Sequence, residues 1–256
     1  MSFEVANSFR KDNLDFYLKE LAKEYRKLGG KAMPAEIILI GGAAVIANYG
    51  FRNMTTDVDA VIHAASVMKD AINNVGDRLN LPKGWLNADF MHTLSYFPKM
   101  DQYSVYYKSF YGVLNVRTVS AEYLLAMKLC SGRKYKNDLS DIIGILYEHE
   151  KRNMPITMSK IDKAVISLYG GWENISADSK KFIEDVMLLD NLEQVYNYIK
   201  AEEKYSKEIL KGFEQGYPGV MNADNVNSIF YNLKKKEKSK AEILQKLKAV
   251  GYRKNE

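Results

Sequence analysis

Residues 37–62 read IILIGGAAVIANYGFRNMTTDVDAVI, and this stretch decides the fold of the first half of the chain. An apolar run predicts a buried strand, Gly41 and Gly42 then open a short helix, and an aspartate pair between apolar neighbours predicts a second strand. Asp57 and Asp59 are two residues apart, so their side chains point to the same face of that strand. Side-by-side carboxylates repel each other unless a divalent cation lies between them, and hard oxygen ligands of this kind suit Mg²⁺. The stretch therefore predicts a magnesium site at a strand end.

The glycines of the same stretch favour a phosphate ligand. Gly41 and Gly42 carry no side chain, so backbone N–H groups at the start of the following helix can approach an anion closely. Thr56, like Thr55 before it, either binds phosphate or caps the turn, and Arg52 pairs either with a phosphate or with a surface carboxylate. The plainer alternative is a tight turn beside a solvated strand edge. The apolar residues that alternate with both aspartates favour a site, and the chemistry that it indicates is phosphoryl transfer with one or two metal ions.

The composition is that of an ordinary globular protein, with 46% hydrophobic and 27% charged residues among 256. The sequence lacks an apolar run of membrane-spanning length and an apolar signal core at its N-terminus, and its one cysteine, Cys130, fits a reducing compartment. We therefore expect a cytoplasmic chain that does not contact a membrane. Dinucleotide-binding and P-loop motifs are absent, and so is a recognisable serine or cysteine nucleophile motif.

Hydrophobic periodicity changes along the chain. Up to about residue 150 it predicts helices mixed with strands, including a hairpin or two short strands between Ser104 and Val119 around Gly112. Beyond Asn153–Pro155 nearly every segment has helical periodicity. We therefore expect an α+β domain over residues 1–153 and a helical C-terminal domain over residues 154–256.

The formal net charge is +5, and basic residues gather at residues 133–136 (RKYK) and 234–240 (KKKEKSK). Such runs are either solvated surface or sites that attract nucleic acid or a nucleotide through non-specific phosphate contacts.

Three ordered motifs carry a family resemblance. The strand, the Gly-Gly turn, the short helix and the apolar-flanked Asp57-Val-Asp59 resemble the nucleotidyltransferase superfamily with the polymerase-beta-like fold. More narrowly, the chain resembles the bacterial group related to type IV abortive-infection toxins and its uncharacterised relatives. The second motif is Trp85-Leu86-Asn87 with Asp89 nearby. The third runs from Glu122 through Lys128 and Arg133 to Asp138-Leu-Ser-Asp141, and the resemblance covers residues 35–147.

This resemblance implies a small mixed sheet with flanking helices and roles for individual residues. Gly41 and Gly42 would shape the phosphate site, while Asp57 and Asp59 would bind Mg²⁺, with two ions in a two-metal site. Lys128 would contact the triphosphate, Asp138 would lie in the second half of the site, and Asp141 would support it. We expect Arg133, Arg52 and Thr56 to contribute to nucleotide binding. From the residues alone, Lys128 is either functional or a lysine at the margin of a core.

The implied activity is transfer of a nucleoside monophosphate from a nucleoside triphosphate to an acceptor hydroxyl of RNA, protein or a small molecule. The resemblance adds a toxin-like role and a regulatory partner protein to this expectation. Active members of the superfamily generally use a third carboxylate on a later strand. The candidate strand here, Val113–Val116, carries Asn115, with Asp89 and Asp101 as substitutes. The alternative is therefore a nucleotide-binding or partner-binding module of the same fold without turnover.

Overall fold

The computed structural model describes residues 8–134, 136–222 and 225–235. The chain divides into two compact units. The first unit comprises Met1–Gly132 and Asp138–Tyr196, and the second comprises Arg133–Asn137 and Asn197–Glu256.

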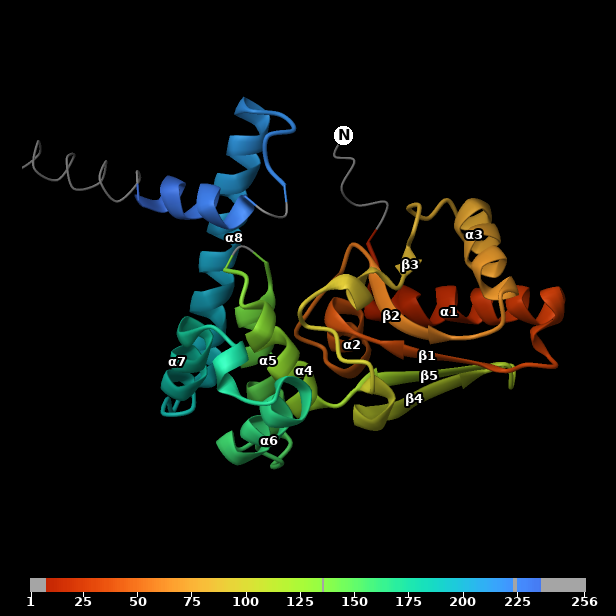
Figure 1. Cartoon of the computed structure of the whole chain (residues 1–256), viewed down its shortest axis with the longest axis horizontal. Helices are drawn as coiled ribbons and strands as arrows, with labels where there is room; N and C mark the ends of the chain where they lie inside the picture. Colours follow the sequence, from red (N-terminus) through yellow and green to blue (C-terminus); the bar gives the residue numbers. More distant parts are fainter. Residues whose placement is uncertain (1–7, 135, 223–224, 236–256) are drawn as a thin grey trace, which may run out of the picture. The chain divides into compact units, whose positions relative to one another are not determined.

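A five-stranded mixed sheet lies at the centre of the first unit (Figure 1). Its strands, in the order β3-β2-β1-β5-β4, are β3 (Leu86–Asn87), β2 (Val58–His63), β1 (Ala35–Leu39), β5 (Leu114–Val119) and β4 (Ser104–Phe110). Strand β1 is antiparallel to β2 and parallel to β5, and β2 is parallel to β3. This arrangement agrees with the predicted mixed sheet.

Strands β4 and β5 form the predicted hairpin. Its tip holds Tyr111 at φ 51° and Gly112 at φ 64°, and the Val113 N–H donates to the Phe110 carbonyl at 3.1 Å. Two successive residues in the left-handed region match the twist of the flanking strands, which is why glycine is favoured here.

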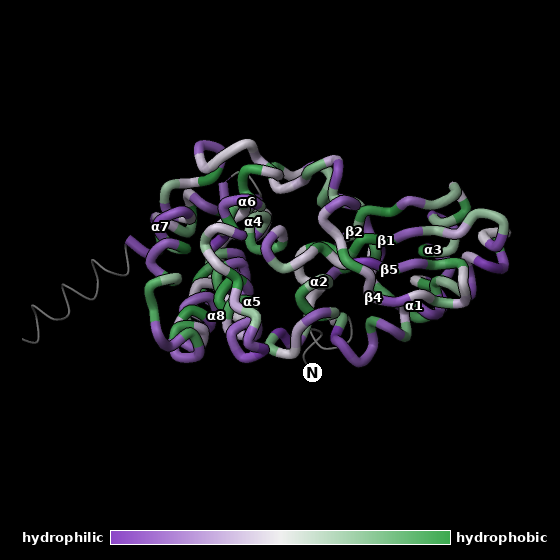
Figure 2. Tube along the Cα trace, turned by 90° about the horizontal axis from the view of Figure 1, so that it is seen from below, coloured by the Kyte–Doolittle hydropathy of each residue, from purple (hydrophilic) through white to green (hydrophobic). Residues whose placement is uncertain are grey.

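Helices α1 (Lys11–Tyr25), α2 (Gly41–Asn48) and α3 (Val67–Leu79) accompany the sheet, and α1 packs against α3. Figure 2 shows hydrophobic residues concentrated along β1, β2 and α2, in agreement with the burial of nearly all of their apolar side chains. The Asn48 side chain donates to Thr118 Oγ1 at 2.9 Å, so α2 covers the face of the sheet to which Thr118 points. The opposite face carries Glu36, His63 and Asn115 at one end, and these residues are half-buried or exposed.

Four further helices complete the first unit: α4 (Ala121–Ser131), α5 (Asp138–Lys151), α6 (Met158–Tyr169) and α7 (Ala177–Val186). Because α5, α6 and α7 all pack against α4, the first unit extends well past residue 153, where the sequence analysis places a domain boundary.

The second unit takes up most of α8 (Leu192–Gly216) and a helical segment over residues 226–235. Leu210, Val226 and Phe230 form a small core, with Met221, Ile229 and Leu233 packed against it. Residues 236–240 of the second basic run lie outside the described residues, as does the end of the predicted helical region. Within the part of the chain that the structure describes, no helix is long and apolar enough to cross a membrane.

A contact between the end of α2 and α5 makes the stability of the first unit depend on pH. The Tyr49 hydroxyl lies 3.1 Å from His149 Nε2, and His149 Nδ1 lies 3.2 Å from the Met154 carbonyl. Burial lowers the pKa of His149 below its ordinary value of 6.5 because it disfavours the imidazolium. Below about pH 6.5 the unfolded chain therefore binds more protons at this residue than the folded one, and folding stability falls as pH drops.

We expect His149→Gln to remove part of this loss. Urea unfolding midpoints measured from pH 7.5 to pH 5.0 should fall less steeply for His149→Gln than for the unchanged protein. His63→Gln is the matched control, because His63 is exposed at the end of β2. If both variants keep the original pH slope, His149 is not the group responsible.

Candidate functional site

The Gly-Gly turn and the aspartate pair meet at one end of the sheet. The Ile40 N–H donates to the Asp59 carbonyl at 3.0 Å, which places Asp59 beside the start of α2. Thr118 is paired with Leu39 and Leu39 with Ala60, so α2 covers the face of β2 to which Ala60 points. Side chains alternate along a strand, so Asp59 points to the other face. Asp57 lies just before β2, which begins at Val58 and not at Asp57 as the sequence predicts. Asp59 is half-buried and Asp57 is exposed.

The two glycines of the turn have different roles: Gly41 adopts a positive φ, and Gly42 allows the close approach of neighbouring side chains. Gly41 has φ +54°, and a Cβ atom built on it would lie 3.4 Å from Asp59 Oδ2. The absent side chain therefore leaves space beside this carboxylate. A Cβ atom on Gly42 would lie 2.5 Å from Thr55 Oγ1 and 2.8 Å from Arg52 Nη2. The N-cap residue of α2, Ile40, makes no side-chain hydrogen bond to the first N–H groups of the helix.

Replacement of Gly41 tests this geometry. Gly41→Ala should cost about 1–2 kcal/mol of folding stability because a residue with a Cβ is strained in the left-handed region. It should also weaken binding of a magnesium nucleotide, since the new methyl group would occupy the space beside Asp59. The measurements are urea unfolding and nucleotide titration.

Gly50→Ala is the matched control, because a Cβ atom at Gly50 would meet nothing within 4 Å. Equal effects of the two substitutions would show that the turn at Gly41 has no special role.

A buried ion-pair network adjoins the turn. Lys128 Nζ lies 2.9 Å from Asp138 Oδ1 and 2.8 Å from Asp141 Oδ2, and these three side chains are 8%, 1% and 2% exposed. Arg52 Nη1 also donates to Asp141 Oδ2, and Arg52 Nε donates to the Met54 carbonyl at 3.1 Å. Burial acts to lower the pKa of Lys128, but the carboxylates of Asp141 and Asp138 outweigh it and raise that pKa above its ordinary value. Lys128 is therefore held as a cation, and two cations balance two carboxylates.

This network connects α4 and α5 to the loop that follows α2. The structure brings Arg52, Lys128 and Asp138 together, with Asp141 between them. Arg52 pairs with a buried carboxylate 89 positions away, and its guanidinium packs on Gly42. Arg52 also lines a pocket of about 540 Å³, together with the basic residues Arg10 and Lys11.

Two other predicted residues lie outside this network. Thr56 is exposed beside the aspartate pair, and its hydroxyl lies 3.4 Å from Asp57 Oδ1. Arg133 belongs to the second unit.

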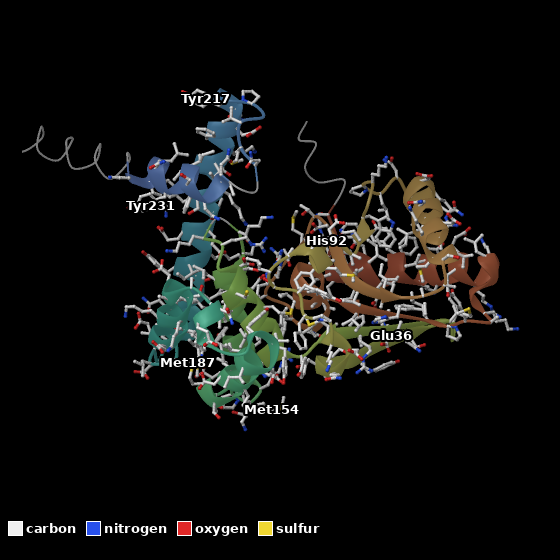
Figure 3. All side chains as sticks on the ribbon, viewed as in Figure 1. Glu36, His92, Met154, Met187, Tyr217 and Tyr231 are labelled. Carbon is white, nitrogen blue, oxygen red and sulfur yellow. The ribbon has the colours of Figure 1, made fainter. Side chains whose placement is uncertain are left out.

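Asn115 does not occupy the place of a third carboxylate. It pairs with Glu36 of β1 (labelled in Figure 3), which in turn pairs with His63 of β2. His63 is four residues along β2 from Asp59, or roughly 13 Å. The candidate strand therefore does not place Asn115 beside Asp59, because the parallel register with β1 puts Asn115 at the other end of the sheet.

The neighbour of Asp59 on the other side is Asn87, which is in register with it on β3. The Asp89 N–H donates to Asn87 Oδ1 at 2.9 Å, and Asp89 begins a 3₁₀-helix, η2 (Asp89–His92), that contacts β2. Trp85 anchors this segment: its side chain is buried, its Nε1 donates to the Ile72 carbonyl at 3.0 Å, and its carbonyl accepts the Val58 N–H at 2.9 Å. In the sequence, the Trp85-Leu86-Asn87 motif was therefore the feature that pointed to Asn87 as a neighbour of Asp59.

The donor set at Asp57 and Asp59 fits Mg²⁺. Both groups are carboxylates, and the missing Gly41 side chain leaves space at Asp59 Oδ2. In the described residues, no three His, Cys, Asp or Glu side chains are grouped so that they could hold a metal ion. A cation here would thus take water or phosphate oxygens as its other ligands, as Mg²⁺ commonly does.

Residues 17–166 match the family described as "nucleotidyltransferase of unknown function" (DUF6036). The chain belongs to this nucleotidyltransferase family. The match includes all five strands and both halves of the site, from the Gly-Gly turn to Asp138 and Asp141. No curated protein and no solved structure matches the chain.

Proposed function

We propose that this nucleotidyltransferase moves a nucleoside monophosphate from a nucleoside triphosphate to an acceptor hydroxyl in a Mg²⁺-dependent reaction that releases pyrophosphate. The observation that carries the proposal is the first turn of α2, where the Asp59 carboxylate lies next to Gly41 and the N-cap residue supplies no side-chain cap. A phosphate can be held there by the N–H groups of the helix start.

In this proposal Asp57 and Asp59 hold the metal, and the chain's other groups orient the nucleotide. When bound, Mg²⁺ neutralises the phosphate oxygens and stabilises charge at the reacting phosphorus. Gly41 and Gly42 let the phosphates approach the backbone. We assign Lys128 and Asp138 a positioning role, because both are buried in the network that holds Arg52 and Asp141 against the turn.

A second candidate function is nucleotide binding without turnover. It is favoured by the composition of β5, whose six residues include no carboxylate. Asp89 and Asp101 remain the candidates for a third catalytic carboxylate. Asp89 begins η2, Asp101 is the second residue of the 3₁₀-helix η3 (Met100–Tyr103), and each of these helices contacts a strand of the sheet.

One experiment separates these functions. The melting temperature is measured with Mg²⁺ and each nucleoside triphosphate, and transfer of the α-phosphate label is measured after addition of a cell extract that supplies acceptor hydroxyls. Binding to the folded state stabilises it by about 2.7 kcal/mol at a hundredfold excess over Kd. Stabilisation with Mg²⁺-dependent transfer of the label supports the transferase, stabilisation without transfer supports the binding module, and the absence of both contradicts a nucleotide site.

The resemblance to abortive-infection toxins extends the proposal to a toxin-like activity on RNA or protein under the control of a partner protein. Separating labelled products into RNA and protein fractions, after reaction with a cell extract, identifies the acceptor. Label in neither fraction would contradict a macromolecular acceptor.

A further inference from the structure

One face of α8 in the second unit carries a row of lysines (α8 in Figure 1). Lys200, Lys204, Lys207 and Lys211 follow each other at intervals of four, three and four residues. Residues at these intervals lie on the same side of a helix. All four are exposed, and at 1.5 Å per residue the row is roughly 16 Å long. We call these four residues the α8 lysine face.

A second basic segment lies beside the α8 lysine face. Residues 133–137 connect α4 to α5 in the sequence but group with the second unit. Lys207 Nζ donates to Asn137 Oδ1, which holds this segment next to the middle of the lysine row. Lys134 and Lys136 are exposed. The two segments therefore form one basic surface, although they are more than 60 positions apart in the sequence.

The glutamates of α8 in the second unit differ in exposure and contacts. Glu202 Oε2 lies 3.3 Å from Lys234 Nζ, and Glu214 Oε1 accepts the Gly219 N–H at 2.8 Å. Glu203 is buried, with 2% of its surface exposed. Glu208 is exposed between Lys204 and Lys211, so it offsets part of their positive charge.

The described residues of the second unit carry a net positive charge. Among the described residues 133–134, 136–137, 197–222 and 225–235, nine lysines and arginines accompany four glutamates. A surface with this excess of positive charge attracts polyanions.

We propose that the α8 lysine face, together with Lys134 and Lys136, binds the phosphodiester backbone of a nucleic-acid strand, and that the acceptor of the transfer reaction is a nucleic acid. Regularly spaced ammonium groups suit a backbone with regularly spaced phosphates, and contacts of this type give affinity without sequence readout. The identity of the acceptor rests on the proposed function, whereas binding of the strand does not.

Binding is tested with the full chain and a fluorescently labelled single strand of 20 nucleotides, as RNA and as DNA, without Mg²⁺ or nucleotide. Fluorescence anisotropy between 50 and 300 mM salt gives Kd at each salt concentration. The variant Lys200→Gln/Lys204→Gln/Lys211→Gln keeps the Lys207–Asn137 hydrogen bond. It should lower the slope of log affinity against log salt by about 2, because each phosphate contact contributes about 0.7 for single strands.

The matched control is Lys160→Gln/Lys163→Gln/Lys181→Gln, which removes the same charge from exposed lysines of the first unit. It should change affinity less than threefold. Asp57→Asn/Asp59→Asn should still bind the strand, so failure of the transfer reaction and failure of this inference can be told apart.

Binding of RNA, of DNA or of both, with loss in the α8 variant alone, supports the inference, and the two strands show which nucleic acid is preferred. Absence of binding at 50 mM salt overturns it. An equal loss of affinity in the control variant also overturns it, because the effect would then come from net charge and not from the α8 lysine face.

Discussion

Replacing Asp57 and Asp59 together by asparagine should lower Mg²⁺-dependent nucleotide incorporation by about 10³-fold or more. Asparagine keeps the shape of each side chain and removes the charge that binds the cation. Metal stabilisation of a phosphoryl transition state is worth several kcal/mol, and each 1.4 kcal/mol changes the rate tenfold. The measurement is incorporation of label from an α-³²P-labelled triphosphate under single-turnover conditions.

The folded state should tolerate this double substitution. Asp57 is exposed and Asp59 half-buried, so removing two neighbouring charges relieves repulsion rather than opening a cavity. Asp70→Asn/Asp77→Asn is the matched control, since it removes two exposed carboxylates from α3. Incorporation that falls equally in both variants, or that survives in Asp57→Asn/Asp59→Asn, would remove the aspartate pair from the mechanism.

The largest effect on stability is expected from Lys128→Met. The substitution leaves Asp138 and Asp141 buried with Arg52 as their remaining cation in the network. Removing one partner of a buried ion pair typically costs 3–5 kcal/mol, because the charge that is left cannot be solvated. Urea unfolding should show a loss of about this size, with a fall of roughly 10 °C in melting temperature.

A double variant distinguishes the loss of charge balance from the loss of packing. Lys128→Met/Asp138→Asn again leaves equal numbers of cations and carboxylates, so it should recover more than 1 kcal/mol relative to Lys128→Met. Lys163→Met on the exposed surface of α6 should stay within about 0.5 kcal/mol of the unchanged protein. A small effect of Lys128→Met would mean that the network does not hold α4, α5 and the turn together.

Local sequence patterns were sufficient to predict the elements that form the N-terminal part of the site. The strand β1, the Gly-Gly turn, α2 and the strand with Asp59 follow from periodicity and from glycine at a left-handed position, all within 26 residues. The hairpin of β4 and β5 is likewise a local feature, and it follows from its β-branched and aromatic residues around Gly112.

Long-range relations could not be predicted in this way. The register of β5 on β1 depends on pairing between distant segments, so the sequence could not show that Asn115 lies at the far end of the sheet from Asp59. Strand β3 has only two residues, too few for a periodic signal, although it places Asn87 next to Asp59. The pairing of Arg52 with Asp141 likewise depends on how α5 packs.

The central claim is that the Asp57/Asp59 site transfers a nucleoside monophosphate. It is tested most directly by incubating the purified chain and a cell extract lacking the chain with triphosphates labelled at either the α- or the γ-phosphate. Covalent, Mg²⁺-dependent retention of the α label in an acceptor, with the γ label released in pyrophosphate, is the predicted result. Retention of the γ label, or equal α labelling with Asp57→Asn/Asp59→Asn, would contradict it.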